Sequence, residues 1–139
     1  MRKDIPRWLA REVRLRAKGV CEYCRLPQSS QEATFHIDHV VPLAAKGDTS
    51  LENLALACTT CSLKKGARIA ARDPKSGKLV PVFSPRAHDW SSHFRWSADF
   101  KAVGKTSTGR ATIALLGMNR PAILAIRQVW AQLGVFPPA

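Results

Sequence analysis

All four cysteines of this chain occur in two CxxC pairs, and a long insert separates Cys21 and Cys24 from Cys58 and Cys61. This spacing is typical of a tetrahedral site in which four thiolates bind one zinc ion. Two disulfides or four buried thiols are the alternatives. No signal peptide precedes the cysteines, and structural disulfides belong to oxidising compartments. The pattern therefore predicts a structural zinc ion in a cytoplasmic protein, and it requires the insert to fold back between the two pairs.

The insert has the pattern of a hairpin followed by a helix. β-Branched and aromatic residues over positions 33–41 predict a strand, and residues 51–58 have the pattern of a returning segment. Thr59 or Thr60 is a suitable N-cap for a short helix, which Gly66 would end. The predicted fold class is therefore α+β, with a zinc-stapled hairpin and helix at its core.

Asp38 and His39 lie side by side within the predicted strand. Because side chains alternate along a strand, His36 and Asp38 should share one face and His39 should point to the other. A carboxylate can hold a cation such as Mg²⁺, and a neutral imidazole can take a proton from water. An isolated Asp-His pair is usually a turn or a surface pair. Its position between two CxxC pairs, with Asn53 before the second, favours metal-assisted hydrolysis.

Taken together, these motifs resemble the zinc-containing HNH endonucleases of the ββα-metal class. The resemblance covers about a third of the chain and rests on CxxC, Asp-His-Val-Val-Pro-Leu and Glu-Asn-Leu-Ala-Leu-Ala-Cys-Thr-Thr-Cys-Ser-Leu-Lys-Lys-Gly. A downstream stretch, residues 108–120, is similar to the tail of small bacterial HNH proteins. The resemblance implies that His39 is the general base and Asp38 a ligand of the catalytic metal. It also implies that Asn53 ties down the loop that orients His39.

The sequence departs from the family pattern at Ser62. The last letter of the motif, His or Asn in the family, falls at this position. A serine hydroxyl is a poorer ligand than an amide or an imidazole, so we expect the metal to be held more weakly. His36, which should share a strand face with Asp38, or a water held by Ser62 would complete the donor set. Imidazole would favour Mn²⁺ or Ni²⁺ over Mg²⁺.

The charge balance favours a polyanion as partner. The 139 residues include 22 basic and 10 acidic side chains, which give a formal net charge of +12. Ribosomal association or simple solubility are the alternatives. No apolar run is long enough to span a membrane. The length predicts a single domain over residues 1–139, with a nuclease core at 20–70 and a C-terminal extension at 71–139.

Helices are expected on both sides of this core. The first covers residues 4–18, capped by Asp4 and ended by Gly19, and its predicted core face consists of Trp8, Leu9, Val13 and Leu15. Residues 78–83 and 100–106 read as short strands, and two further helices run from about Thr106 to 116 and from 121 to 133. This last pair could cover the hairpin or form a homodimer interface. The aromatics of residues 85–96 could stack on unpaired bases, but we expect them to pack against the zinc-binding part.

These features together predict a metal-dependent endonuclease that hydrolyses phosphodiester bonds of DNA with little sequence preference, with RNA as the alternative substrate. Lys64, Lys65 and Arg68 would hold the nucleic-acid backbone. The first rival is a non-catalytic zinc-dependent nucleic-acid-binding module whose catalytic metal site has lapsed, and Ser62 supports it. The second rival is an assembly protein that uses its C-terminal helices.

Overall fold

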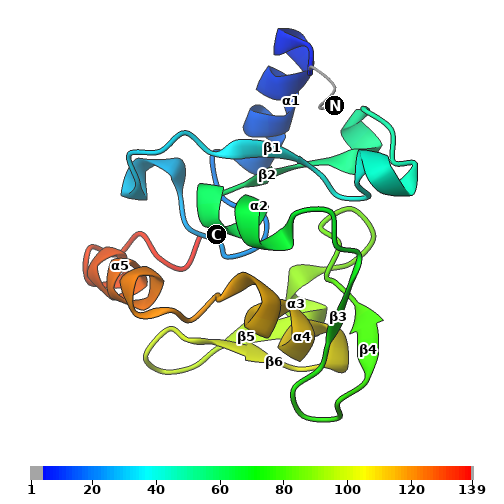
Figure 1. Cartoon of the computed structure of the whole chain (residues 1–139). Helices are drawn as coiled ribbons and strands as arrows, with labels where there is room; N and C mark the ends of the chain where they lie inside the picture. Colours follow the sequence, from blue (N-terminus) through cyan, green and yellow to red (C-terminus); the bar gives the residue numbers. More distant parts are fainter. Residues whose placement is uncertain (1–4, 139) are drawn as a thin grey trace.

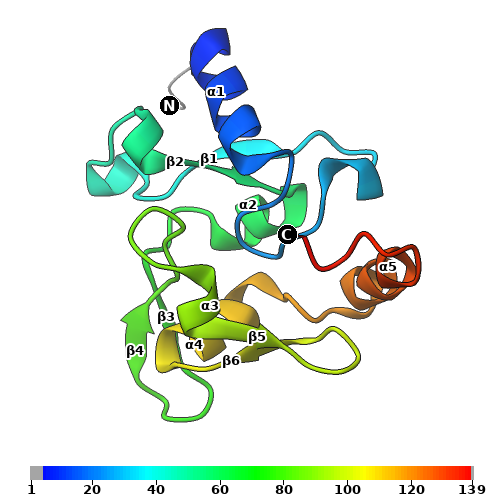
Figure 2. The same ribbon diagram turned by 180° about the vertical axis from the view of Figure 1, so that it is seen from behind.

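The chain forms five α-helices and three two-stranded antiparallel sheets over residues 5–138, the part that this computed structural model describes (Figure 1). Short 3₁₀ turns at Gln28–Ser30, Leu43–Ala45 and Leu51–Asn53 connect them. The predicted α+β class is confirmed. Helix α1 and the first sheet lie at one end of the molecule, α2 lies next to them, and the remaining elements form the other end (Figure 2).

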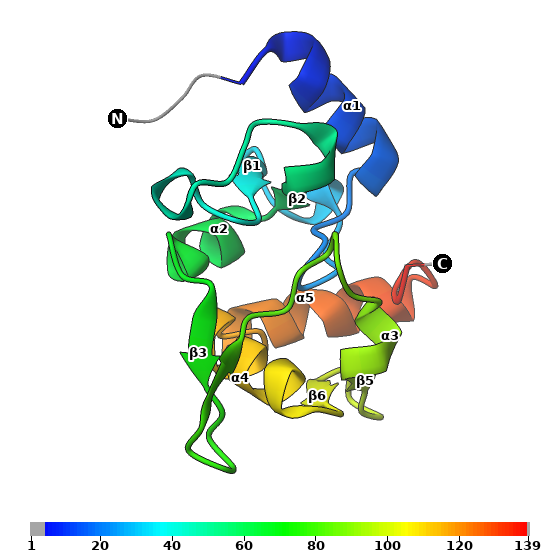
Figure 3. The same ribbon diagram turned by 90° about the vertical axis from the view of Figure 1, so that its right-hand side faces the viewer.

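The first sheet is the hairpin predicted from the insert. Strand β1 (His36–His39) pairs with β2 (Leu54–Ala57), with His36 opposite Ala57 and His39 opposite Leu54. All four residues of β2 are buried. Helix α1 (Arg7–Ala17) packs on one side of the hairpin and α2 (Thr59–Lys65) on the other (Figure 3). Asp38 and His39, the two catalytic candidates, therefore lie on a strand of a hairpin that α1 and α2 cover.

Helix α2 begins at Thr59, within the predicted region, but its N-cap is Cys58 rather than a threonine. The sulfur of Cys58 accepts a hydrogen bond from the backbone N–H of Cys61, so a zinc-ligand candidate also serves as the N-cap. Gly66 ends the helix with φ of 54°, as its sequence position predicted, and its N–H donates to the Ser62 carbonyl at 3.0 Å. The helix thus starts inside the cysteine cluster.

Helix α1 buries a narrower face than its sequence indicates. Leu9 and Val13 are buried, but Trp8 and Leu15 are 65% and 61% exposed, so the prediction that they belong to the core is wrong. Leu9 and Val13, four residues apart, contact the hairpin, whereas Trp8 and Leu15 lie around the helix from them. The predicted cap Asp4 lies outside the described residues.

Two arginines of α1 bind the backbone of the hairpin region. Arg14 donates to the carbonyl of Phe35 at 2.9 Å. Arg16 donates to the carbonyls of Leu51 and Leu54 at 2.7 and 2.5 Å. These contacts fix the helix against both strands. Arg14 and Arg16 are therefore structural residues in this conformation.

The C-terminal half contains two further hairpins and three helices. Strand β3 (Ala70–Arg72), which the sequence did not indicate, pairs with β4 (Leu79–Pro81). Helix α3 (Trp90–His93) leads into β5 (Phe94–Trp96), which pairs with β6 (Ala102–Gly104). Helix α4 (Ser107–Leu116) starts at Thr106, whose hydroxyl accepts from the N–H of Gly109, and α5 (Pro121–Gln132) follows. The predicted helices at 106–116 and 121–133 are confirmed.

One apolar core joins both halves of the chain. It includes Val13 of α1, Cys21 and Cys24, Leu56 of β2, Phe94 of β5 and Ile123 of α5. Trp90 donates from Nε1 to the carbonyl of Tyr23 at 2.8 Å, between the two cysteines of the first pair. The aromatics of residues 85–96 therefore pack against the cysteine-containing region, as expected. No helix of the described residues is long and apolar enough to cross a membrane.

Candidate nuclease site and cysteine cluster

The four cysteines converge as the CxxC spacing predicted. Their sulfur atoms all lie within 4.8 Å of one another, and all four side chains are buried. Sulfurs at the corners of a tetrahedron around zinc, each about 2.3 Å from the metal, are about 3.8 Å apart. The Cys24 and Cys58 sulfurs are 3.7 Å apart. The donor set therefore fits one zinc ion.

Backbone hydrogen bonds shape both CxxC turns. The N–H of Cys24 donates to the sulfur of Cys21 at 3.5 Å, and the N–H of Cys61 donates to that of Cys58 at 3.4 Å. Hydrogen bonds from the other three thiols lower the pKa of Cys58, whereas burial raises the pKa of Cys21. Without a metal, negative charge in the cluster is therefore concentrated on Cys58, and the other thiols act as its hydrogen-bond donors.

Glu22 fastens the first CxxC turn to the hairpin. Its Oε2 accepts from the backbone N–H of Leu56 at 2.8 Å, and its own N–H donates to the Leu56 carbonyl at 2.8 Å. The other carboxylate oxygen is paired with Arg86. Glu22 was not singled out from the sequence, because its partners are far along the chain.

Asp38 lies between β1 and α2, where it is only 8% exposed. Its Oδ2 accepts from the hydroxyl of Tyr23 at 2.9 Å and lies 3.2 Å from the ammonium of Lys65. Burial raises the pKa of Asp38, and the attraction of Lys65 opposes that rise. The carboxylate thus already has a cationic partner from α2, which it contacts through Oδ2.

Lys65 is placed differently from the surface position expected of it. It is 2% exposed, and its ammonium also donates to the carbonyl of His39 at 3.0 Å. Lys65 follows Ser62 by three residues and so lies on the face of α2 that packs on β1. In this conformation its charge serves Asp38 and is not available to a phosphate.

His36 and Ser62 contact each other directly. The Nδ1 atom of His36 lies 2.9 Å from the hydroxyl oxygen of Ser62. His36 and Asp38 both face α2, in agreement with strand alternation. A carboxylate, an imidazole and a hydroxyl oxygen therefore lie between β1 and α2. These donors would suit a transition-metal ion such as Mn²⁺.

The side chain of His39 contacts the loop between the strands. Its Nε2 lies 3.0 Å from the hydroxyl of Thr49, in the loop between the strands. Thr49 was not singled out from the sequence, and no spacing rule marks it. A threonine hydroxyl at this distance can fix the ring orientation of a histidine, and because the hydroxyl can donate or accept, it is compatible with either tautomer.

Asn53 closes the loop that carries Thr49. Its Oδ1 accepts from the N–H of Val41 at 2.9 Å, and its Nδ2 donates to the carbonyls of Val41 and Asp48 at 3.0 and 2.8 Å. One amide side chain thus joins both ends of the loop. These bonds are of the kind that the resemblance implied for Asn53.

The closed loop leaves no room for a side chain at Gly47. A Cβ there would lie 1.8 Å from the carbonyl oxygen of Val41 and 2.8 Å from Nδ2 of Asn53. Gly47→Ala should therefore push the loop open and lower the unfolding free energy by about 1–3 kcal/mol, the usual cost of overpacking. Thermal or urea unfolding measures this. The control Ala45→Ser, at an exposed position in the same loop, should unfold like the wild type. Equal stability of the Gly47 variant would contradict the close approach.

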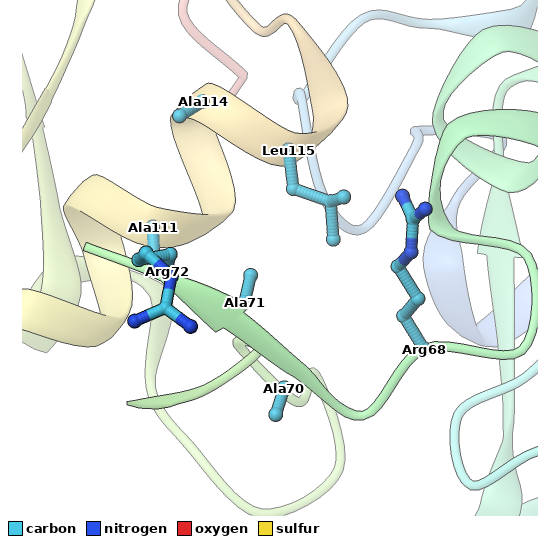
Figure 4. A pocket seen from close by; sticks show the side chains of 7 residues that line it. All are labelled: Arg68, Ala70, Ala71, Arg72, Ala111, Ala114 and Leu115. Atoms are coloured by element: carbon cyan, nitrogen blue, oxygen red, sulfur yellow. The ribbon is translucent and has the colours of Figure 1, made fainter. Parts of the chain in front are cut away.

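Lys64 and Arg68 are exposed, as expected of groups that bind a backbone. Arg68 lines a pocket of about 350 Å³ between β3 and α4. In Figure 4, Arg68 and Arg72 stand at its two ends, with Ala70 and Ala71 between them. The pocket combines an apolar floor with cations at its rim, and it extends the basic surface beyond α2.

The sequence was compared with models of known protein families, with curated proteins and with solved structures. Residues 21–68 match the family model for HNH endonucleases. Searches of curated proteins and of solved structures found no match for the chain. The match ends at residue 68, so the similarity of the downstream tail stays a prediction. An HNH domain indicates nuclease or nucleic-acid-binding activity. The segment that carries the cysteine cluster, Asp38, His39 and Asn53 thus matches the HNH endonuclease family.

Proposed function

We propose that this protein is a metal-dependent endonuclease that hydrolyses phosphodiester bonds of DNA with little sequence preference. The observation that carries the proposal is the arrangement around β1. Asp38 and His39 lie on one strand, Asn53 and Thr49 hold the loop beside His39, and the segment matches HNH endonucleases. A structural zinc ion bound by the four cysteines would hold this arrangement together.

His39 would act as the general base. If Nε2 donates its hydrogen to Thr49, the tautomer that results has Nδ1 as the proton acceptor. The imidazole would remove a proton from a water molecule behind the scissile phosphorus. As the water oxygen bonds to phosphorus, the bond to the 3′ oxygen breaks, and a 5′ phosphate remains on the other product.

Asp38 would hold the catalytic divalent ion, with His36 and Ser62 from the same face as additional donors. When bound, such an ion supplies positive charge to the phosphoryl oxygens and the departing 3′ oxygen. The chain's own contribution is to keep Asp38 ionised and oriented, through Tyr23 and Lys65. Lys64, Arg68 and Arg72 would contact phosphates without reading bases.

The donor at position 62 should set the metal requirement. Ser62→Asn replaces the hydroxyl with an amide oxygen and should lower the Mg²⁺ concentration for half-maximal cleavage. His36→Ala should raise the Mn²⁺ and Ni²⁺ requirement more than that of Mg²⁺, because imidazole suits transition metals better. A titration of cleavage rate against each ion measures both effects.

The matched control for this titration is Ser50→Ala, which removes a hydroxyl that bonds to Asp48 rather than to His36 or Asp38. Its titration curve should coincide with that of the wild type. An unmoved curve for Ser62→Asn would mean that position 62 does not face the ion.

A second function is a non-catalytic nucleic-acid-binding module. The ion pair between Asp38 and Lys65 and the bond between His36 and Ser62 favour it, because both occupy the donors that a catalytic ion would need. Nicking of supercoiled plasmid with Mg²⁺, Mn²⁺ or Ni²⁺ distinguishes the two. The nuclease proposal predicts cation-dependent nicks, and the binding module predicts retarded but intact plasmid with every ion.

A further inference from the structure

Arg127 of α5 is an arginine in an apolar interior. Its side chain is completely buried, and its guanidinium lies 4.9 Å above the ring of Trp96. Nη1 donates to the carbonyl of Phe100 and to Oδ1 of Asn119, both at 3.2 Å. Nε and Nη2 are buried and have no hydrogen-bond partner among the described residues. A buried cation with three of its five N–H donors unsatisfied is costly unless an anion lies nearby.

No carboxylate of residues 5–138 provides that anion. The ion pairs within residues 5–138 join Asp38 to Lys65, Glu22 to Arg86, Asp73 to Arg110 and Asp99 to Lys101, so Arg127 takes part in none. Burial lowers the pKa of Arg127, and the groups that act against this are the cysteines Cys24, Cys61 and Cys21. Three of the four cysteines of the cluster are thus within electrostatic reach of this guanidinium, and they become its anionic partners when zinc binds them as thiolates.

The position of α5 agrees with this neighbourhood. Ile123, four residues before Arg127 and so on the same face of the helix, belongs to the core that also contains the cysteines. Figure 3 shows α5 below the loop that carries the first CxxC pair. Four thiolates around one zinc dication keep a net negative charge. A buried centre of this kind needs a counter-ion as much as Arg127 does.

We propose that Arg127 is the buried counter-ion of the zinc–thiolate centre and that it couples α5 to metal binding. The inference rests on the proposed zinc site but not on nuclease activity. Outer groups of this kind typically contribute about 10–100-fold to metal affinity. The competing explanation is a purely structural one, in which Arg127 only fastens α5 to Trp96 and Phe100.

Three variants separate charge from packing. Arg127→Gln keeps amide donors for Phe100 but removes the charge, and Arg127→Lys keeps the charge. Arg120→Gln is the matched control, because Arg120 stands at the start of the same helix and its guanidinium bonds to the carbonyls of Leu116 and Gly117 instead. The zinc Kd is measured for the full-length chain by competition with a chromogenic chelator.

The counter-ion role predicts that Arg127→Gln loses about 10–100-fold in zinc affinity, while Arg127→Lys and Arg120→Gln stay near the wild type. In the Co²⁺-substituted protein, the sulfur-to-cobalt charge-transfer band of Arg127→Gln should shift to longer wavelength, because sulfur electrons are less stabilised without the cation. A merely structural role would not move this band in a folded variant.

Each other result has a definite meaning. If the wild type holds no zinc, both the zinc site and this inference are overturned. If the wild type holds zinc and Arg127→Gln binds it equally, only the inference is overturned. Equal weakening in Arg127→Gln and Arg127→Lys would overturn the charge argument. If Arg127→Gln does not fold, Arg127→Lys becomes the test. The proposal then requires that Arg127→Lys binds zinc as tightly as the wild type and keeps the cobalt band at the wild-type wavelength. Weaker zinc binding or a shifted band in Arg127→Lys would overturn the proposal.

Discussion

Removal of the metal with a strong chelator is expected to unfold this protein. Cys21, Cys24, Cys58 and Cys61 are all buried and belong to the main core, which joins α1, the hairpin and α5. Without a cation, four sulfurs within 4.8 Å of one another would have to share protons in that interior. Structural zinc contributes roughly 10–16 kcal/mol, which is as large as the whole stability of a typical domain. Circular dichroism and tryptophan fluorescence during chelation would follow the loss of structure.

The same experiment has an internal control. Addition of Zn²⁺ should restore both signals, whereas Mg²⁺ should not, because thiolates prefer soft or borderline cations. Elemental analysis should find one zinc ion per chain. A purified, folded protein without zinc, or spectra that the chelator leaves unchanged, would refute the structural role of the metal.

Replacement of His39 with alanine should lower the rate of DNA cleavage by about 10²–10⁴-fold, the usual contribution of a general base. DNA affinity should stay close to that of the wild type, because the imidazole contacts Thr49 and the cations proposed to hold the phosphates, Lys64 and Arg68, are left in place. Cleavage of a labelled duplex at saturating metal gives the rate, and retardation in chelator-free buffer without divalent ion gives the affinity.

His93 provides the matched control. It is another half-buried histidine, and its Nδ1 lies 2.6 Å from the hydroxyl of Thr106, which parallels the contact of His39 with Thr49. His93→Ala should cut DNA at nearly the wild-type rate. A His39 variant as active as this control would show that the base is a different group.

Local patterns predicted the parts of the fold that depend on neighbours in sequence. The CxxC spacing predicted the cysteine cluster, Gly66 marked the end of α2, and Thr106 marked the start of α4. These features follow from turn and cap chemistry within a few residues. The hairpin was likewise visible in the residue pattern of the insert.

The parts that the sequence left open depend on contacts between distant segments. Trp8 and Leu15 have apolar side chains but face away from the hairpin, and only the docking of α1 decides that. Lys65 and Arg127 resemble ordinary surface cations in sequence, yet one binds Asp38 and the other is buried. Thr49 next to His39 carries no motif at all. Such partners are set by tertiary packing rather than by local preference.

The activity itself is tested most directly by plasmid nicking with zinc-loaded wild type and His39→Ala, prepared in parallel and assayed with Mg²⁺, Mn²⁺, Ni²⁺ or none. We predict that the wild type converts supercoiled plasmid to open circles only when a divalent ion is present, and that His39→Ala leaves it supercoiled over the same time. Intact plasmid with the wild type under every ion, or equal nicking by both proteins, would contradict the assignment of a metal-dependent nuclease centred on His39.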